Sequence, residues 1–339
     1  MTDTQIPPPP PLPETPPPLL EIRDLAIGFG SGDYLPVRGL DFTLMKGEVA
    51  GLVGESGSGK SLTAYGLMGL LPHGANFRRG QIIFKGRDIL KLPPKERRAL
   101  AGSSMSMIFQ EPLTALNPVL TVGEQVAEIF RVKLGQDRKR ARESACAILS
   151  QVGLPNPMAA HSSYPHRFSG GMRQRVVIAM ALALNPDLVI ADEPTTALDP
   201  TIALQIIRLL KGMTAKRGTG VLFITHNLRI LQGLACRILV MYAGLIMEET
   251  GEGGIADPSH PYTRGLVAAL PPNPSRNEGK ILVPIPGQAP GPGDVAAGCP
   301  FAPRCPESVT RCSESLPELL PVRGGGRVRC FKREAGGDS

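Results

Sequence analysis

Tryptophan is absent from the 339 residues, and aromatic residues together make up only 4% of the chain. Proteins that hold single-stranded nucleic acid stack its bases on aromatic side chains, so this scarcity argues against such a partner even though the net charge is +7. Long hydrophobic runs are also missing, because the longest, residues 176–184, is far below the roughly 20 residues that cross a bilayer. We therefore expect no membrane-spanning helix and no nucleic-acid partner.

The first 18 residues contain nine prolines and lack both a basic start and an apolar stretch. No secretory signal is expected there. A disordered leader of polyproline type is the favoured interpretation, and a ligand for an aromatic-lined groove is the alternative. Length and a hydrophobic content of 42% allow a main domain, expected over residues 19–265, while the prolines and glycines that follow indicate a small irregular domain over residues 266–339.

The clearest motif is a glycine-rich loop at residues 54–61, which matches G-x-x-x-x-G-K-S. An apolar strand pattern precedes it and a helix pattern follows it, as a phosphate-binding loop requires, whereas a simple turn needs neither. Its backbone N–H groups would point at phosphate oxygens at the positive end of the helix. Lys60 is predicted to reach the β- and γ-phosphates and Ser61 to hold Mg²⁺. The residues predicted to bind ATP are Gly54, Ser56, Gly57, Ser58, Gly59, Lys60, Ser61 and Leu62.

Strands and helices alternate through the rest of the main domain. A hairpin is expected over residues 20–45, strands at 81–84, 104–109, 188–192 and 221–225, and helices over 121–152 and 201–215. This order predicts an α/β fold with a parallel core sheet. Ligands of such sheets bind beyond the carboxyl ends of the strands, where Asp192, Glu193 and His226 follow apolar runs. Asp192 is predicted to coordinate Mg²⁺, and Glu193 to orient or deprotonate the attacking water.

A second group of motifs carries a family resemblance. The segment Phe168-Ser169-Gly170-Gly171-Met172-Arg173-Gln174-Arg175 resembles the signature of ATP-binding-cassette (ABC) proteins, although Met172 stands where many relatives have glutamine. The similarity covers roughly residues 20–260 and includes Asp192-Glu193-Pro194 and Thr196-Ala197-Leu198-Asp199. It implies a P-loop ABC-type nucleotide-binding domain with a parallel core sheet, an antiparallel β subdomain and an α-helical subdomain.

The same resemblance implies roles for individual residues. Gln110 would belong to the Q-loop and contact Mg²⁺, and His226 would be the switch histidine at the γ-phosphate, although a histidine at a strand end is often an ordinary hydrogen-bonded residue. Two subunits would face each other head to tail and share each ATP. The residues of this chain implied to bind the ATP held by the partner's phosphate loop are Ser169, Gly170 and Gly171 of the signature, and Asp199 is also implied to bind nucleotide. Phe29 is favoured over Tyr34 as the aromatic that stacks on adenine.

The tail narrows the resemblance further. His260-Pro261-Tyr262-Thr263-Arg264, Ile285-Pro286-Gly287 and the segment at residues 298–306 resemble the C-terminal region of ATPase subunits from bacterial oligopeptide and dipeptide importers, and nickel importers share part of it. The resemblance implies a second, often non-identical ATPase subunit, two transmembrane permeases, an external substrate-binding protein, and a peripheral position on the cytoplasmic face of the inner membrane. A permease coupling helix would dock at residues 110–118. Soluble ABC ATPases of DNA repair or translation usually have two cassettes or a long coiled-coil insertion, which this chain lacks.

Four of the six cysteines lie in the tail: Cys299, Cys305, Cys312 and Cys330. A cytosolic ATPase occupies a reducing compartment, which disfavours disulfides, while four thiolates suit zinc or an iron–sulfur cluster. The spacing of the cysteines does not decide between the two. Because some relatives with this tail hold a [4Fe-4S] cluster, the resemblance favours that cluster over Zn²⁺ and over free thiols, as a structural clamp or a redox sensor. Cys146 and Cys236 are predicted to be buried thiols.

Overall fold

The computed structural model describes residues 16–30, 32, 34–196, 198–232, 234–251, 255–270, 283–291, 294, 297–322 and 325–333. Most of the proline-rich leader, residues 1–15, lies outside this range, as do residues 271–282 of the expected linker. Among the described residues, no helix combines the length and the apolar character that crossing a bilayer demands.

An antiparallel sheet forms the first layer, with the strand order β2-β1-β4-β5. Its strands are β1 (Leu20–Phe29), β2 (Val37–Leu44), β4 (Ala75–Phe84) and β5 (Arg87–Asp88). The expected hairpin over residues 20–45 is confirmed, because β1 and β2 pair antiparallel from Leu20↔Leu44 to Ile27↔Val37. The strand expected at residues 81–84 is real but begins six residues earlier.

Within the described part of the chain, the main sheet has eight strands in the order β11-β12-β10-β9-β3-β8-β7-β6. The strands β9, β3, β8, β7 and β6 run parallel, and β10, β12 and β11 extend the sheet antiparallel at one edge. Their bounds are β3 (Val49–Val53), β6 (Met105–Ile108), β7 (Leu188–Asp192), β8 (Gly220–Thr225), β9 (Arg237–Tyr242), β10 (Leu245–Thr250), β11 (Leu320–Pro321) and β12 (Gly326–Val328). The strands that sequence patterns placed at 104–109, 188–192 and 221–225 are confirmed.

The parallel strands are buried on both faces, which explains their continuous apolar runs. On β3, Leu52 belongs to the core between the two sheets, while Val53 belongs to the core under the helices. On β8, Leu222 and Phe223 divide in the same way.

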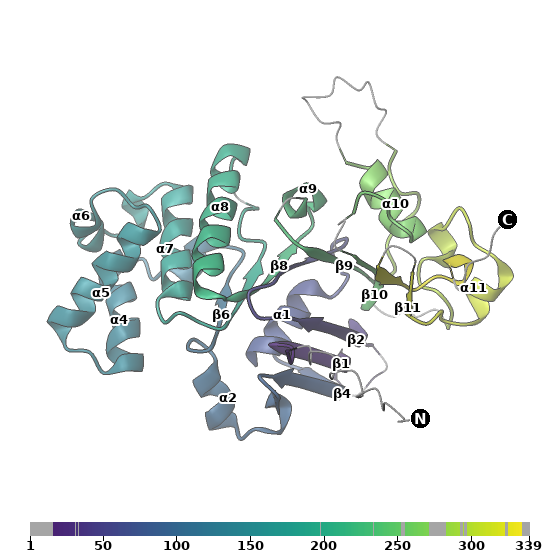
Figure 1. The fold of residues 1–339 in the computed structure, drawn as a ribbon, viewed down its shortest axis with the longest axis horizontal. Coiled ribbons are helices and arrows are strands. Elements are labelled where there is room, and N and C mark those ends of the chain that lie inside the picture. The colour runs from purple at the N-terminus through teal and green to yellow at the C-terminus, as the bar shows by residue number, and fades with distance from the viewer. Residues whose placement is uncertain are drawn as a thin grey trace, which may run out of the picture.

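Most helices cover the face of the main sheet that is turned away from the antiparallel sheet, and they extend to one side of it (Figure 1). Helix α1 is the exception, because its buried residues belong to the core between the two sheets. The chain forms α1 (Lys60–Met68), α2 (Pro94–Leu100), α3 (Pro112–Ala115), α4 (Val122–Leu134), α5 (Arg138–Gln151), α6 (Pro157–His161), α7 (Gly170–Leu182), α8 (Pro200–Arg217), α9 (Leu228–Leu231), α10 (Pro261–Ala268) and α11 (Thr310–Glu314). The helical stretch expected over residues 121–152 is two helices. Gly135 ends α4 in the left-handed conformation, and the side chain of Asp137 caps α5.

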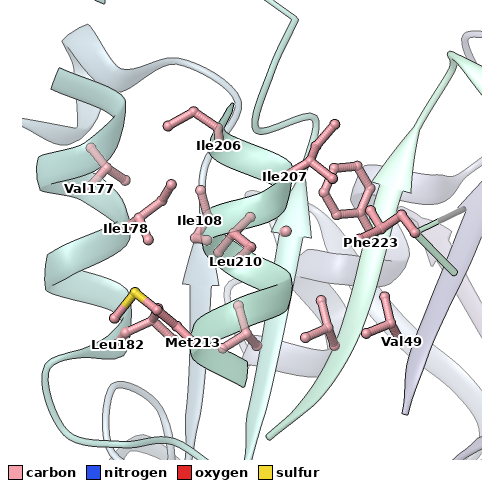
Figure 2. Packing of buried hydrophobic residues seen from close by; sticks show 14 of the residues in the cluster. Val49, Ile108, Val177, Ile178, Leu182, Ile206, Ile207, Leu210, Met213 and Phe223 are labelled. Atoms are coloured by element: carbon pink, nitrogen blue, oxygen red, sulfur yellow. The ribbon is translucent and has the colours of Figure 1, made fainter. Parts of the chain in front are cut away.

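Helix α8 shows how the helical core is built (Figure 2). Its apolar residues recur on one face at Ile206, Ile207, Leu210 and Met213, all buried. Figure 2 shows them between α7, which supplies Val177, Ile178 and Leu182, and the strands that carry Val49 and Phe223. Each fully buried side chain of this size contributes about 1.5–3 kcal/mol, so this face fixes α8 on the sheet.

The C-terminal tail shares the sheet and the core of the main domain. Strand β12 pairs with β10 through Glu248↔Val328, and β11 pairs with β12. Phe301 of the tail is 2% exposed and joins the same hydrophobic cluster as Tyr242 and Tyr262. The expected domain boundary at residue 265 falls inside α10 and stays a prediction.

Candidate nucleotide-binding and hydrolysis site

The glycine-rich loop connects the end of β3 to the start of α1, as its sequence context predicts. Gly57 and Gly59 have φ values of 79° and 103°, a region that side chains other than glycine rarely adopt. Gly54 is needed for a different reason, because a Cβ there would lie 2.0 Å from the carbonyl oxygen of Met241 on β9. The loop therefore bends tightly and presents its backbone at the N-terminus of α1, where a helix attracts anions.

Lys60 is the first residue of α1, and its side chain folds back over the loop. Its Nζ donates hydrogen bonds to the carbonyl oxygens of Gly54 and Glu55 at 2.8 and 2.9 Å and to the Ser58 hydroxyl at 3.3 Å. The side chain is buried, which lowers the pKa of its ammonium, while Glu193, Asp192 and Glu55 act to raise it. The cation that the sequence assigns to the phosphates is thus held by the loop itself.

Asp192 ends β7 and faces Ser61 at the start of α1. The Ser61 hydroxyl donates to Asp192 Oδ1 at 3.2 Å, and Asp192 is only 1% exposed. Burial raises the pKa of this carboxyl, and the hydrogen bond from Ser61 opposes that shift. A buried carboxylate beside a hydroxyl is the oxygen donor set that Mg²⁺ prefers, so these two residues fit the predicted metal.

Glu193 lies at the centre of a hydrogen-bonded group. Its Oε1 is 2.9 Å from His226 Nδ1, and its Oε2 accepts from Gln110 Nε2 at 3.2 Å and from the Thr196 hydroxyl at 2.8 Å. Burial alone would raise the Glu193 pKa, but the hydrogen bonds from His226 and Thr196 and the charges of His226 and Lys60 outweigh it and lower the pKa. Glu193 is therefore an ionised carboxylate at neutral pH.

Sheet order explains why these residues meet. Gln110, Glu193 and His226 follow β6, β7 and β8, which are adjacent parallel strands whose carboxyl ends share one edge. Glu193 itself has a φ of 46°, and its N–H donates to the carbonyl oxygen of Ile224 on β8 at 2.9 Å. This bond fixes the residue at the strand end despite its unusual backbone.

The structure adds one contact that the sequence reasoning missed. Thr196 was noted only as part of a motif, but its hydroxyl bonds the predicted base directly. The spacing Glu193-x-x-Thr196 within one turn was the available signal. Gln110, which the resemblance assigned to Mg²⁺, contacts Glu193 here, and its metal contact stays a prediction.

The two aromatic candidates for adenine stacking lie against each other. The rings of Phe29 and Tyr34 stack with centroids 6.2 Å apart and planes 20° apart. Both therefore belong to one aromatic surface at the end of β1, whose last residue is Phe29, and the preference for Phe29 stays a prediction.

The signature segment forms the start of α7. Ser169 caps this helix by accepting from the Met172 N–H at 3.4 Å, and Gly171 has no room for a Cβ, which would lie 2.6 Å from Ile202. Met172, which replaces a common glutamine, packs against the helical core. Asp199 caps α8 in the same manner by accepting from two backbone N–H groups. Ser169, Gly170 and Asp199 are exposed.

The four tail cysteines gather in one region. The Cys299 N–H donates to the Cys312 carbonyl at 2.8 Å, and burial raises the pKa of the Cys299 thiol to about 11, with further increases from Cys312, Cys305 and Cys330. Within the described residues, however, no three His, Cys, Asp or Glu side chains are arranged to hold a metal ion. The expected metal centre is therefore not supported by the geometry.

The prediction of two other buried thiols is wrong for Cys236. This residue is exposed, whereas Cys146 is half-buried beside Met158. Cys236 immediately precedes β9, and its N–H bonds the carbonyl of Val49 at 2.9 Å. The backbone of Cys236 is thus bonded to β3 just before β9 begins, while the side chain reaches solvent, which an apolar neighbourhood in sequence does not reveal.

Comparison with known proteins extends these observations. A family model described as ABC transporter matches residues 37–196, and one described as oligopeptide/dipeptide transporter, C-terminal region, matches residues 254–312. The oligopeptide transport ATP-binding protein AppD of Bacillus subtilis (strain 168) is 43% identical over 325 residues, which are 94% of this chain and 98% of that protein. The oligopeptide transport ATP-binding protein OppD of Salmonella typhimurium is 45% identical over 318 residues, 93% of both chains.

Solved structures agree on the fold. The dimeric structure of the ATP-binding cassette MJ0796 in a post-hydrolysis state with ADP and Pi superposes with a TM-score of 0.62 at 25% identity, covering 69% of this chain and 98% of that one. The fold and the assembled strand-end site define a P-loop ATPase of the ABC type. With its tail included, the chain belongs to the ABC transporter ATP-binding subunits that carry the oligopeptide/dipeptide transporter C-terminal region.

Proposed function

We propose that this chain is the ATP-hydrolysing subunit of a bacterial importer that takes up dipeptides or oligopeptides through partner permeases. One observation carries the proposal: a hydrolytic strand-end site and the C-terminal region typical of peptide importers occur on the same chain. Relatives along nearly the full length are named as dipeptide or oligopeptide transport ATP-binding proteins.

The side chains divide the reaction among them. Lys60 and the loop amides bind the phosphates, and Ser61 and Asp192 hold Mg²⁺, which neutralises phosphate charge when bound. The ionised Glu193 accepts a proton from the attacking water, and His226 and Thr196 keep its carboxylate oriented. Gln110 links this base to the helical part of the molecule that follows β6.

The proposed site is completed by a second ATPase subunit, identical or paralogous. The exposed start of α7, with Ser169 and Gly170, offers a hydroxyl and backbone N–H groups to a phosphate held by the facing subunit. Closure on ATP would then depend on both subunits, and the assembly would need an external binding protein to deliver substrate.

The proposed docking place for a permease is a largely apolar groove of about 550 Å³. Phe109, which precedes Gln110, and Ala115, which lies within residues 110–118, line it together with Glu128 and Ile129 of α4. A short coupling helix is the occupant we propose, because the groove adjoins the residues that contact Glu193. This arrangement would place the chain peripherally at the cytoplasmic face of the membrane.

Reconstitution tests the proposal. The chain is purified with its permeases and second ATPase, inserted in proteoliposomes, and supplied with the external binding protein and labelled di- to pentapeptides. We expect peptide accumulation that requires Mg·ATP and fails with Glu193→Gln. ATP-dependent uptake of nickel without peptide uptake would instead assign the chain to the nickel branch of the family, and hydrolysis without any uptake would contradict the import role.

The cysteine group carries a separate hypothesis. We propose that the four tail thiols bind a [4Fe-4S] cluster, with Zn²⁺ as the alternative. The closeness of the four cysteines and the affinity of thiolates for these metals support the proposal. The arrangement of the side chains does not support it, because among the described residues no three potential ligands are placed to hold a metal ion. Anaerobic purification followed by iron, sulfide and zinc analysis decides the matter. A metal-free protein with six titratable thiols would refute both forms.

A further inference from the structure

The C-terminal tail holds the phosphate loop through a partly buried ion pair, in which the Arg304 side chain is buried and the Glu55 side chain is half-buried. Arg304 lies in a turn of the tail and is 8% exposed. Its guanidinium donates hydrogen bonds to the carboxylate of Glu55, the second residue of the loop motif. Both terminal nitrogens of the guanidinium take part, at 2.7 and 3.1 Å from the two carboxylate oxygens. Such a two-point pair fixes direction as well as distance.

The tail fixes Arg304 in turn. Its Nε donates to the carbonyl of Pro286 at 2.8 Å, and one terminal nitrogen donates to the Tyr242 hydroxyl at 3.2 Å. The guanidinium carbon lies 5.7 and 5.9 Å from the ring centroids of Tyr242 and Phe301. With these contacts in place, Arg304 cannot follow Glu55 if the loop shifts.

A second tail-side contact acts on the same loop residue. The backbone N–H of Glu55 donates to the hydroxyl of Tyr262 at 3.0 Å, and Tyr262, in the first turn of α10, is fully buried. The carbonyl of Glu55 accepts from Lys60 Nζ at 2.9 Å. One loop residue thus has its side chain and its N–H held by the C-terminal region and its carbonyl bound to the cation expected to meet the phosphates.

We propose that Arg304 and Tyr262 are positioning residues for nucleotide binding, so that the C-terminal region sets the ATP affinity of the phosphate loop. The inference rests on the proposed ATP site at Lys60. It assigns the tail a role within the ATPase itself, beyond any part it has in transport. Arg304 and Tyr262 would not contact the nucleotide, because both act on the phosphate loop through Glu55.

Equilibrium ATP binding by the full-length chain tests the inference. Arg304→Met is expected to raise the ATP Kd about tenfold, a typical coupling between sites, while the number of nucleotides bound per chain is unchanged. Arg304→Lys should recover part of the affinity, because an ammonium satisfies one carboxylate oxygen but cannot bind both. In ATPase assays of the assembled transporter, the effect should appear in KM more than in kcat.

A matched control separates positioning from attachment of the tail. Arg327 also joins the tail to the main domain, through Glu249 at 2.7 Å. This contact lies near Arg237 at the start of β9, whereas the loop follows the opposite end of the neighbouring parallel strand β3. Arg327→Met should lower the melting temperature without changing the ATP Kd. An equal rise in Kd for both variants, or a lower melting temperature with unchanged Kd for Arg304→Met, would overturn the inference.

Tyr262→Phe keeps the test decisive if Arg304→Met does not fold. This change removes one hydroxyl, retains the aromatic packing, and should raise the Kd about threefold through loss of a single hydrogen bond; an unchanged Kd would count against the inference. Lys60→Ala reports on the underlying site. If Lys60→Ala still binds ATP, the assignment of the ATP site is wrong. If Lys60→Ala loses ATP binding while Arg304→Met and Tyr262→Phe both keep normal affinity, only the role of the tail is refuted.

Discussion

Replacing Glu193 with glutamine removes the proposed base while leaving its surroundings almost intact. The glutamine oxygen can occupy the position of Oε2, where Gln110 and Thr196 both donate. Its amide nitrogen then faces His226 Nδ1, which accepts in the other imidazole tautomer. All three hydrogen bonds of the carboxylate thus have a counterpart, so nucleotide binding should be preserved.

The chemical step loses its proton acceptor, because an amide does not take a proton from water. General base catalysis typically contributes about 10²–10⁴-fold, which corresponds to about 3–5 kcal/mol in the barrier. The assay compares ATP turnover by the assembled transporter at saturating Mg·ATP with equilibrium ATP binding. Glu143→Gln on the exposed face of α5 is the control and should hydrolyse normally. Wild-type turnover in Glu193→Gln would refute the assignment, and loss of ATP binding would refute the proposed hydrogen-bond exchange.

Three further outcomes are expected. Leu210→Ala should lower the free energy of unfolding by about 2–5 kcal/mol in urea titrations, because Leu210 is 2% exposed, while Leu204→Ala on the same helix, at 53% exposure, should change it by less than about 0.5 kcal/mol. Asp192→Asn should raise the melting temperature of the nucleotide-free chain at pH 7. Because burial raises the pKa of Asp192, the protonated carboxyl favours the folded state. This stabilisation is complete when the pH is below the ordinary pKa of 3.8, and it is lost as the pH rises through the pKa of the folded state. Equal melting temperatures for the two proteins would contradict this reasoning. Thiol labelling at pH 8 should modify exposed Cys236 well before Cys299, which is buried and has a pKa raised to about 11; the reverse order would refute these environments.

The sequence predicted the chemistry of the site more completely than its packing. The phosphate loop, Asp192, Glu193 and His226 each follow an apolar strand, and parallel strands bring their carboxyl ends to one edge. Contiguous motifs therefore gave the site directly. Thr196 could be placed in a motif, and its spacing from Glu193 was the available signal, but the hydrogen bond between them is seen only in the folded structure.

Features that depend on pairing between distant segments could not be predicted from the sequence. Nothing in residues 320–328 reads as a long strand, yet β11 and β12 extend the main sheet because β10 offers them an edge. The break between α4 and α5 could have been found from Gly135 and Asp137, which are typical helix-ending and helix-starting residues. The exposure of Cys236 could not be predicted, since it depends on how the chain enters β9 in the folded protein.

A loop with three glycines over residues 54–59 is entropically costly to order, since glycine loses more backbone freedom on folding than any other residue. Here the ordering is done before nucleotide arrives. Gly54 is wedged against Met241 of β9, and the next residue, Glu55, is held by Tyr262 and Arg304. Such preorganisation increases affinity by removing the cost of ordering from the binding step. Tyr262 and Arg304 both lie within residues 254–312, the stretch that matches the oligopeptide/dipeptide transporter C-terminal region, so this stretch contributes directly to the order of the phosphate loop.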